Sequence, residues 1–502
     1  MSDSLARRIQ GLSPEKRALL EQHLLRGHGG TPAEDDDAIP RRQPDEPAPL
    51  SFSQFRLWFL DQWAPGDPTY NAGLAFRLAG SVDRMRLRAA VERVIDRHEA
   101  VRTVFRAVDG VPRQVVLDQW SFDLPEADLS SLPEPARSLE LAERLRRESR
   151  RPFDLAADLM LRATLFRLGP DEAVLLLVEH HIAFDGWSDS ILFAEVAEVY
   201  AALGAGREPR LTPLPVQYAD FALWQRRRLT GPRLDRLTDY WRRQLAGAPP
   251  VLTLPTDRPR PATMSFEGGH HHFALEPGVA SGVTELGREE ATTAYMTLLA
   301  AFAATLHAWA GCADLCIGTP IAGRGRVELE PLIGFFSNTL VLRVLVDGEL
   351  SFRQLLGRVK ETALGAYEHQ ELPFEKVVET VAPPRSPQHN PLFQVNFRVQ
   401  AAPAEPLQLP AVEVTSLDTD VGFARFDLAL ELQLRPPGLA GYVEYNQALF
   451  DRATAVAFAG RFERLLSAAL ACPDAPIRTL GDASSGRRDP SEGIAGFRRR
   501  RT

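Results

Sequence analysis

The sequence contains few cysteines and no long apolar run. Its three cysteines, Cys312, Cys316 and Cys472, form neither a disulfide framework nor a Cys-x-x-Cys pair. A reducing cytoplasm is therefore the simplest compartment for the protein. No apolar run approaches the length of a membrane span, and the first residues lack the apolar core of a secretory signal. The sequence thus predicts a cytoplasmic protein without a membrane partner.

Lysine is the second scarce residue type. Only Lys16, Lys360 and Lys376 are present, and arginine supplies the remaining positive charge. Together with the many alanines, glycines and prolines, this usage indicates a bacterium with a GC-rich genome. The net charge of −8 argues against nucleic acid as a partner. A chain of 502 residues with 44% hydrophobic and 25% charged residues is typical of a soluble globular protein with two or more lobes.

The stretch 179–188, with the sequence EHHIAFDGWS, carries the clearest functional signal. The apolar run 173–178 before it has the length of a buried strand. The Gly-Pro-Asp turn at 169–171 predicts that this strand pairs with 161–168 as a hairpin. Ser188 and Asp189 are good helix N-cap residues, and apolar residues at helical spacing follow them. The two histidines should therefore lie where a strand ends and a helix begins. Such a junction can hold a side chain rigidly at a cleft.

The residue types in this stretch indicate proton-transfer chemistry. Histidine is the side chain most readily used for proton transfer near neutral pH. Consecutive strand residues point to opposite faces, so one of His180 and His181 should act on a substrate while the other packs. Asp185 could fix the loop through a hydrogen bond or an ion pair, and Gly186 allows a ligand to approach the backbone closely. The alternative is a pair of core histidines, which Asp and Gly at fixed offsets argue against.

Strands and helices alternate in two regions of similar size, which predicts an α/β fold with a site at the lobe interface. The expected segments are a helical docking or capping segment over 1–28, a flexible linker over 29–48, a first lobe carrying the histidine motif over 49–228, a second lobe over 229–475, and a disordered tail over 476–502.

Two other catalytic chemistries find little support. His270, His271 and His272 do not predict a metal site, because in a strand only the outer two share a face and no acidic or cysteine ligand stands at fitting spacing. A serine nucleophile is also disfavoured, because no Gly-x-Ser-x-Gly elbow is present.

Seven ordered stretches resemble the signatures of the condensation domains of nonribosomal peptide synthetases. The resemblance covers about residues 48–475, nearly the whole body of the chain. Besides 179–188, the matching stretches are LSFSQFRLWFL (50–60), RHEAVRTVF (97–105), YADFALW (218–224), IGFFSNT (333–339), HQELPFE (369–375) and 385–394, which contains NPLFQ.

The resemblance implies two chloramphenicol acetyltransferase-like lobes arranged as a V-shaped pseudo-dimer, with a tunnel between them. Donor and acceptor peptidyl carrier proteins, within or alongside other synthetase modules, would bring substrates as thioesters on phosphopantetheine arms. The donor aminoacyl or peptidyl group would pass to the acceptor amine and form a peptide bond. The resemblance implies no cofactor and no metal bound by this chain.

The family's site residues map onto six positions of this sequence. His181 is the expected catalytic histidine, either as a general base for the acceptor amine or as a group that positions the nitrogen. His180 would be its packing partner. The resemblance implies that Asp185 is ion-paired with an arginine of the second lobe, for which Arg324 is the candidate. The Gly186 N–H could stabilise the oxyanion of the tetrahedral intermediate, and Asn390 would reach the tunnel from the second lobe.

Several related functions are distinguished by particular residues. Trp187 precedes Ser188, whereas epimerisation domains place Ser before Trp, and the paired histidines argue against a heterocyclisation domain. The opening signature most resembles the subtype that accepts an L-configured donor. No adenylation, carrier or thioesterase signature is present, so we expect a stand-alone protein or one excised from a larger synthetase.

Two other functions stay open. One is a stand-alone transferase that passes a carrier-bound acyl group to a free amine or alcohol. The other is a non-catalytic platform that docks carrier proteins or a tailoring enzyme, although such members usually have an altered histidine motif. The arginine clusters at 146–147, 150–151 and 226–228 could receive acidic carrier proteins, but solvated helix faces explain them equally well.

Overall fold

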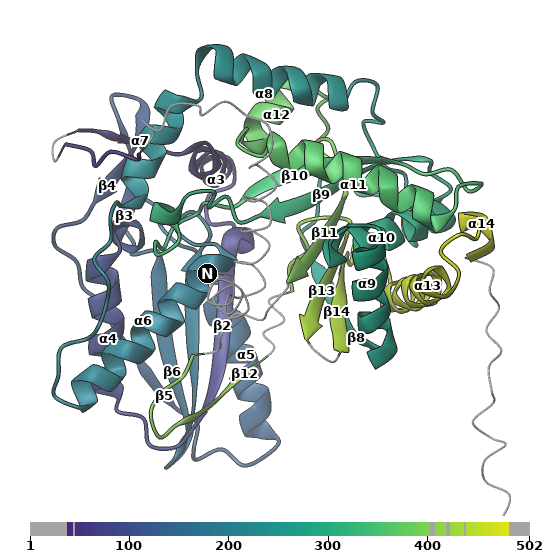
Figure 1. Cartoon of the computed structure of the whole chain (residues 1–502). Coiled ribbons are helices and arrows are strands. Elements are labelled where there is room, and N and C mark those ends of the chain that lie inside the picture. Colours follow the sequence, from purple (N-terminus) through teal and green to yellow (C-terminus); the bar gives the residue numbers. More distant parts are fainter. Residues whose placement is uncertain (1–37, 44–45, 401–406, 418–421, 436–437, 481–502) are drawn as a thin grey trace, which may run out of the picture.

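The computed structural model describes residues 38–43, 46–400, 407–417, 422–435 and 438–480. The helix predicted within 1–28 lies outside these residues, as does the tail from 481 onwards. Figure 1 shows two lobes that are joined across the top by α8 (Gly231–Gln244), which begins just after the predicted lobe boundary.

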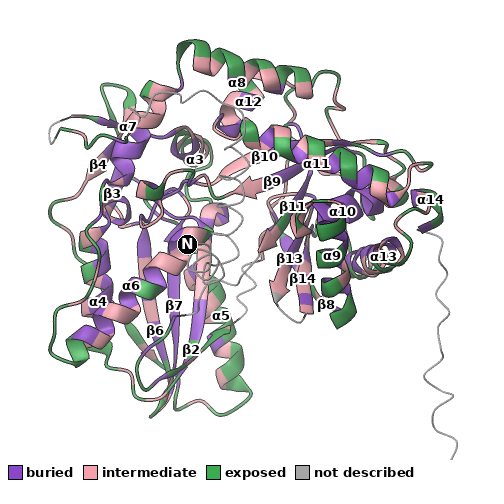
Figure 2. Cartoon of the chain, viewed as in Figure 1, coloured by how far each residue is buried: buried purple, intermediate pink, exposed green. Residues whose placement is uncertain are grey.

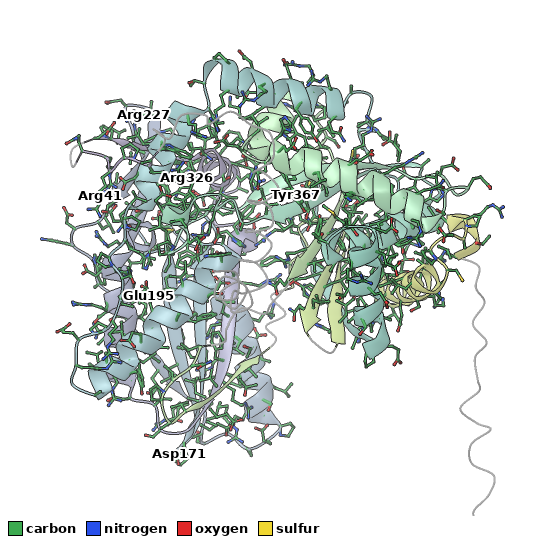
Figure 3. The ribbon with its side chains drawn as sticks, viewed as in Figure 1. Arg41, Asp171, Glu195, Arg227, Arg326 and Tyr367 are labelled. Atoms are coloured by element: carbon green, nitrogen blue, oxygen red, sulfur yellow. The ribbon has the colours of Figure 1, made fainter. Side chains whose placement is uncertain are left out.

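The first lobe is built on a five-stranded sheet with the order β12-β2-β7-β6-β5. Its central strands β6 and β7 form the antiparallel hairpin that the sequence predicts, with Asp171 at the tip farthest from the histidines (Figure 3). Phe193 of α6 packs edge-on against Phe76 of β2, so α6 covers this sheet. The strands are β2 (Asn71–Ala79), β5 (Glu126–Asp128), β6 (Leu161–Gly169), β7 (Glu172–His180) and β12 (Glu413–Leu417).

Two helices of the first lobe, α3 and α4, begin at capping residues that the sequence supplies. Ser51 and Gln54 form a capping box at the start of α3, and Asp83 caps α4. The helices of this lobe are α3 (Phe52–Trp63), α4 (Arg84–Arg97), α5 (Ala136–Ser149), α6 (Gly186–Gly204) and α7 (Tyr218–Arg228). A small sheet completes the lobe, with β1 (Ala48–Pro49), β3 (Thr103–Val108) and β4 (Val111–Val116) in the order β1-β4-β3.

The second lobe is built on a six-stranded sheet with the order β10-β9-β11-β13-β14-β8. Phe302 of α10 stacks on Phe397 of β11 and meets Phe458 of α13 edge-on, so α10 and α13 cover one face of the sheet. The strands are β8 (Gly268–Leu275), β9 (Asp314–Ile321), β10 (Asn338–Leu345), β11 (Val395–Gln400), β13 (Leu428–Arg435) and β14 (Gly438–Asn446). The helices are α9 (Pro277–Glu289), α10 (Ala294–Ala310), α11 (Phe352–Glu368), α12 (Phe374–Val381), α13 (Arg452–Ala471) and α14 (Ile477–Leu480).

Two segments of the second half cross into the first lobe. β12 pairs with β2 along the edge of the first sheet, which would otherwise end in an unpaired strand. Residues from the end of η3 (Val327–Leu329) onwards enter the core of the first lobe, namely Leu329, Leu332, Ile333, Phe335 and Phe336. Assigning all of 229–475 to the second lobe is therefore too simple. Side chains of 329–336 complete the apolar core of the first lobe, and the backbone of β12 completes its sheet.

The body is also longer at both ends than the sequence predicts. Within the expected linker 29–48, Ile39 is buried, and Arg42 forms ion pairs with Glu99 and Asp220 at 2.7 and 3.1 Å. Ile477 in the expected tail is buried, and its N–H donates to the Leu350 carbonyl at 2.9 Å.

Figure 2 shows β7 buried along its length. No helix among the described residues has the length and apolarity to span a bilayer.

Candidate active site

The histidine motif forms a short loop between the end of β7 and the start of α6. β7 ends at His180 and α6 begins at Gly186. The predicted strand-loop-helix order is present, but the helix starts earlier than Ser188, because Asp185 is its N-cap. The Asp185 carboxylate accepts from the Ser188 N–H at 3.0 Å and thereby satisfies one free donor of the first turn.

His181 is held by its backbone and by one ring nitrogen. Its N–H donates to the Tyr70 carbonyl at 3.0 Å, and its Nδ1 lies 3.2 Å from the Phe184 carbonyl oxygen. Because a carbonyl only accepts, Nδ1 carries the proton and Nε2 keeps a lone pair. Burial first, and then the positive charge of Arg425, hold the pKa of His181 well below its usual value. The neutral imidazole can accept a hydrogen bond or a proton at Nε2.

His180 points into the first lobe. Its ring is buried edge-on against Phe153, with ring centroids 5.6 Å apart, and its Nδ1 accepts from the Ile182 N–H at 3.2 Å. Burial lowers the pKa of His180 to about 3, with smaller contributions from Arg425 and Arg162. The two histidines therefore have different surroundings, as strand alternation predicts.

Asp185 connects the two lobes. Its Oδ1 lies 2.9 Å from Nη2 of Arg324, and both side chains are almost fully buried. Nη1 of Arg324 donates to the carbonyls of Leu329 and Leu332 at 2.6 and 2.7 Å. The ion pair that the resemblance implies between Asp185 and Arg324 is present, and Arg324 also shapes the loop that follows it.

The second carboxylate oxygen of Asp185 binds the same loop. Its Oδ2 accepts from the N–H groups of Phe336 and Ser337 at 3.0 and 3.2 Å. Ser188 adds a further link, since its Oγ donates to the Gly334 carbonyl at 3.0 Å and accepts from the Gly334 N–H at 3.1 Å. The start of α6 and residues 334–337 thus form one hydrogen-bonded unit.

Gly186 is exposed and is the first residue of α6. N–H groups in the first turn of a helix have no intrahelical partner and carry partial positive charge. A Cβ added to Gly186 would meet no atom within 4 Å, so the protein itself does not require glycine here.

Asn390 does not contact the histidine loop directly. Its Nδ2 donates to the Arg425 carbonyl at 2.8 Å. Arg425 was not among the residues expected from sequence, although it is the only basic residue in the acidic stretch 411–431. That isolated charge is the signal that could have found it. Asn390 therefore contacts the backbone of Arg425 and not the His181 loop.

A buried acidic pair flanks the loop, and the sequence alone gave no sign of it. Glu179 precedes the histidines on β7, and its carboxyl group interacts electrostatically with that of Asp189 of α6. Burial is the main reason that the pKa of Glu179 is raised well above its usual value and that of Asp189 is raised to about 7. The pair joins the strand and the helix that flank the His181 loop.

A cavity between the lobes is not lined by His181. It has a volume of about 330 Å³, and its lining includes Trp224, Arg326, Phe336 and Tyr367. Figure 3 marks Arg326 and Tyr367. Within the part of the chain that the structure describes, no group of three His, Cys, Asp or Glu side chains could hold a metal ion, and His270, His271 and His272 lie on β8 without one.

The two-lobed α/β arrangement, with a histidine loop held against the second lobe, defines the chloramphenicol acetyltransferase-like class of folds. The model of the condensation domain family matches residues 45–488. The chain belongs to the condensation domain family. This membership confirms the resemblance inferred from the seven signatures, while the subtype for an L-configured donor stays a prediction.

Named relatives and a solved structure agree with this membership. The chain is 44% identical over 454 residues to phosphinothricin tripeptide synthetase PhsC of Streptomyces viridochromogenes, covering 90% of this chain and 42% of that protein. It is 42% identical to a dimodular nonribosomal peptide synthase of Bacillus subtilis, covering 88% of this chain and 19% of that protein. The chain thus spans less than half the length of these relatives. The X-domain from teicoplanin biosynthesis superposes with a TM-score of 0.79 at 30% identity, covering 88% of this chain and 98% of that domain.

Proposed function

We propose that this protein forms a peptide bond by transferring an aminoacyl or peptidyl group from a donor carrier-protein thioester to the amine of an acceptor carrier-bound amino acid. The observation that carries the proposal is the neutral His181 ring, with its Nδ1 proton committed to Phe184 and its Nε2 lone pair available. Family membership supports the reaction class. The donor and acceptor peptidyl carrier proteins would be its partners, within or alongside other synthetase modules.

In the proposed reaction the acceptor nitrogen attacks the thioester carbonyl. A C–N bond forms, the C–S bond breaks, and the donor arm leaves as a thiol that takes up the proton lost by the amine. His181 Nε2 accepts a hydrogen bond from the attacking nitrogen. The lowered pKa of His181 makes it a weak base, which favours positioning of the amine over removal of a proton from an ammonium ion.

The oxyanion of the tetrahedral intermediate would lie near the start of α6. The Gly186 N–H is exposed at a helix N-terminus, where partial positive charge favours an anion. His180, Asp185 and Arg324 support the loop and do not touch the substrate in this proposal. Asn390 supports it from farther away through Arg425. No cofactor or metal is needed, since the substrates arrive on phosphopantetheine arms.

The proposal is tested by reconstitution with two carrier proteins. Donor and acceptor carriers are loaded with aminoacyl thioesters, and the acceptor arm is followed by mass spectrometry after mixing with the protein. We expect dipeptide on the acceptor arm with the unaltered chain, and a rate about 10²–10⁴-fold lower with His181→Ala. His271→Ala on β8 is the matched control and should retain the rate.

Three outcomes would overturn parts of this proposal. If His181→Ala forms product as fast as the unaltered chain, the role of this residue is wrong. If product appears only when a free amine or alcohol replaces the acceptor carrier, the protein is a transferase with a soluble acceptor. If neither acceptor reacts while the carriers still bind, the chain is a non-catalytic platform.

A further inference from the structure

Arg425 extends from the second lobe to the first beside the histidine loop. It lies between β12 and β13, and its Nε and Nη2 donate to the Thr69 carbonyl at 3.4 and 3.2 Å. Its guanidinium carbon lies 5.5 Å from the ring centroid of Tyr70, within the range of a cation–π contact. The Tyr70 carbonyl in turn accepts from the His181 N–H at 3.0 Å. Two adjacent backbone carbonyls therefore bind the two groups: that of Thr69 binds the guanidinium, and that of Tyr70 binds the histidine loop.

The backbone of Arg425 is fixed on the second lobe. Asn390 Nδ2 donates to the Arg425 carbonyl at 2.8 Å, and the Arg425 N–H lies 3.4 Å from Oε1 of Glu444. Thr69, which receives the guanidinium, is itself buried and is held by Asp67, the N-cap of η1 (Pro68–Tyr70). Both ends of the contact are thus anchored, so the charge has a defined place relative to His181.

The guanidinium differs from that of Arg324 in its partners. Arg324 is neutralised by the carboxylate of Asp185. Among the described residues, no carboxylate forms an ion pair with the Arg425 guanidinium, which is bound by a carbonyl and an aromatic face. A desolvated positive charge that is not ion-paired acts strongly on its neighbours, because little solvent screens it. The Glu444 carboxylate acts on Arg425 electrostatically without forming an ion pair with the guanidinium.

We propose that Arg425 is a positioning residue of the condensation site, whose charge keeps the His181 ring unprotonated so that Nε2 stays open to the acceptor amine. This inference rests on the proposed function and adds a second-lobe residue to it. Residues of both lobes would then set the state of the histidine, because the charge comes from one lobe and the ring from the other.

Other charged and polar groups also face His181. His180 adjoins it on β7, and the positive charge of Arg398 of β11 lowers the pKa of His181 by less than that of Arg425 does. The Phe184 carbonyl opposes these effects by accepting from Nδ1, and the Phe335 ring lies 6.1 Å away without charge. Asp185 is turned towards Arg324 and the N–H groups of Phe336 and Ser337. Arg425 contributes more than the other charged groups, because only burial lowers the pKa of His181 further.

The first test compares Arg425→Met and Arg425→Lys by the pH dependence of single-turnover condensation between loaded carriers. With the methionine variant, we expect the acidic limb of the rate profile to move upward by about 0.5–1 pH unit, because the charge that opposes protonation of His181 is removed. Lysine keeps the charge, so its limb should remain within about 0.3 unit of the unaltered protein.

Arg260→Met is the matched control, because it removes an ion pair with Asp427, two residues from Arg425, without touching the histidine loop. Its acidic limb should not move. A uniform loss of rate at all pH values with Arg425→Met, and no movement of the limb, would mean that Arg425 only maintains the fold and would overturn the inference.

A second measurement separates this inference from the proposed function. The imidazole resonances of His181, assigned with His181→Gln, are titrated by NMR in the whole chain with and without Arg425→Met. A rise in the His181 pKa in the variant supports the inference even if the unaltered protein forms no peptide bond. An unchanged His181 pKa overturns it even if condensation is observed.

Discussion

The carboxylate of Asp185 accepts hydrogen bonds from both lobes, and its partner Arg324 is equally buried. A buried ion pair contributes little net stability, but the loss of one partner leaves an uncompensated charge. We therefore expect Asp185→Asn to lower the free energy of unfolding by about 3–5 kcal/mol. Chemical denaturation followed by circular dichroism measures this change.

A matched exposed ion pair tests whether burial causes the loss of stability expected for Asp185→Asn. Asp239 and Arg242 form an ion pair on the surface of α8, with both side chains more than half exposed. Asp239→Asn should change the free energy of unfolding by less than about 1 kcal/mol. Equal effects of the two substitutions would contradict the structural role given to Asp185.

The acidic pair of Glu179 and Asp189 predicts a pH dependence of stability. A carboxyl whose pKa is higher in the folded state than in the unfolded chain stabilises the fold most at low pH, and this stabilisation is lost as the pH rises. For Asp189, with an ordinary value of 3.8 and a folded value of about 7, stability should fall between about pH 4 and pH 7 and then level off.

Asp189→Asn removes this titration while keeping a hydrogen-bonding group beside Glu179. We expect the variant to be more stable than the unaltered protein at pH 8, by about 1 kcal/mol or more, and its stability to vary less between pH 5 and pH 8. Thermal unfolding at several pH values measures both. Parallel pH profiles for the two proteins would show that Asp189 is already ionised in the fold.

Among the elements, the loop over 323–337 is the one that bends to meet the histidine motif. Gly323 has a φ of +65°, and an added Cβ there would collide with the Phe336 carbonyl oxygen. Gly323→Ala should therefore destabilise the protein by about 2 kcal/mol or more and slow condensation by displacing residues 334–337. Thermal unfolding and the carrier assay measure these effects.

Gly325 provides the control within the same loop, because an added Cβ there meets no atom within 4 Å. Gly325→Ala should leave the stability and the rate nearly unchanged. Similar losses in both variants would show that general loop flexibility, and not the left-handed turn at Gly323, determines the geometry.

Local patterns in the sequence predicted the elements near the site well. The apolar run before the histidines is β7, and the turn at 169–171 gives the β6–β7 hairpin. The helix start was placed too late because Ser188 and Asp189 are both good caps, while Asp185 accepts from Ser188 only in the folded chain. Propensity alone does not choose between neighbouring caps.

Contacts between distant segments could not be predicted from local patterns in the sequence. β12 has five residues, and none of its side chains is fully buried, so no strong apolar alternation marks it as the partner of β2. The pairing of Asp185 with Arg324 came from family resemblance and not from spacing. Arg425 lies 356 residues from Thr69, and only the packing of the two lobes brings them together.

At the scale of the whole molecule, the crossing segments should make the two lobes unfold together. Phe335 and Phe336 belong to the core of the first lobe, and β12 closes its sheet edge. Differential scanning calorimetry should therefore give one transition whose calorimetric and van't Hoff enthalpies agree. Two resolved transitions would show that each lobe holds together without the other.

The pairing of β12 with β2 also has a consequence during synthesis on the ribosome. Ala79 of β2 is translated more than three hundred residues before its partner Glu413. At ~5–20 residues per second, the edge of the first sheet waits on the order of half a minute for the strand that covers it. An uncovered edge strand is a template for aggregation. Nascent chains of this protein should therefore depend on chaperones until residue 417 has emerged.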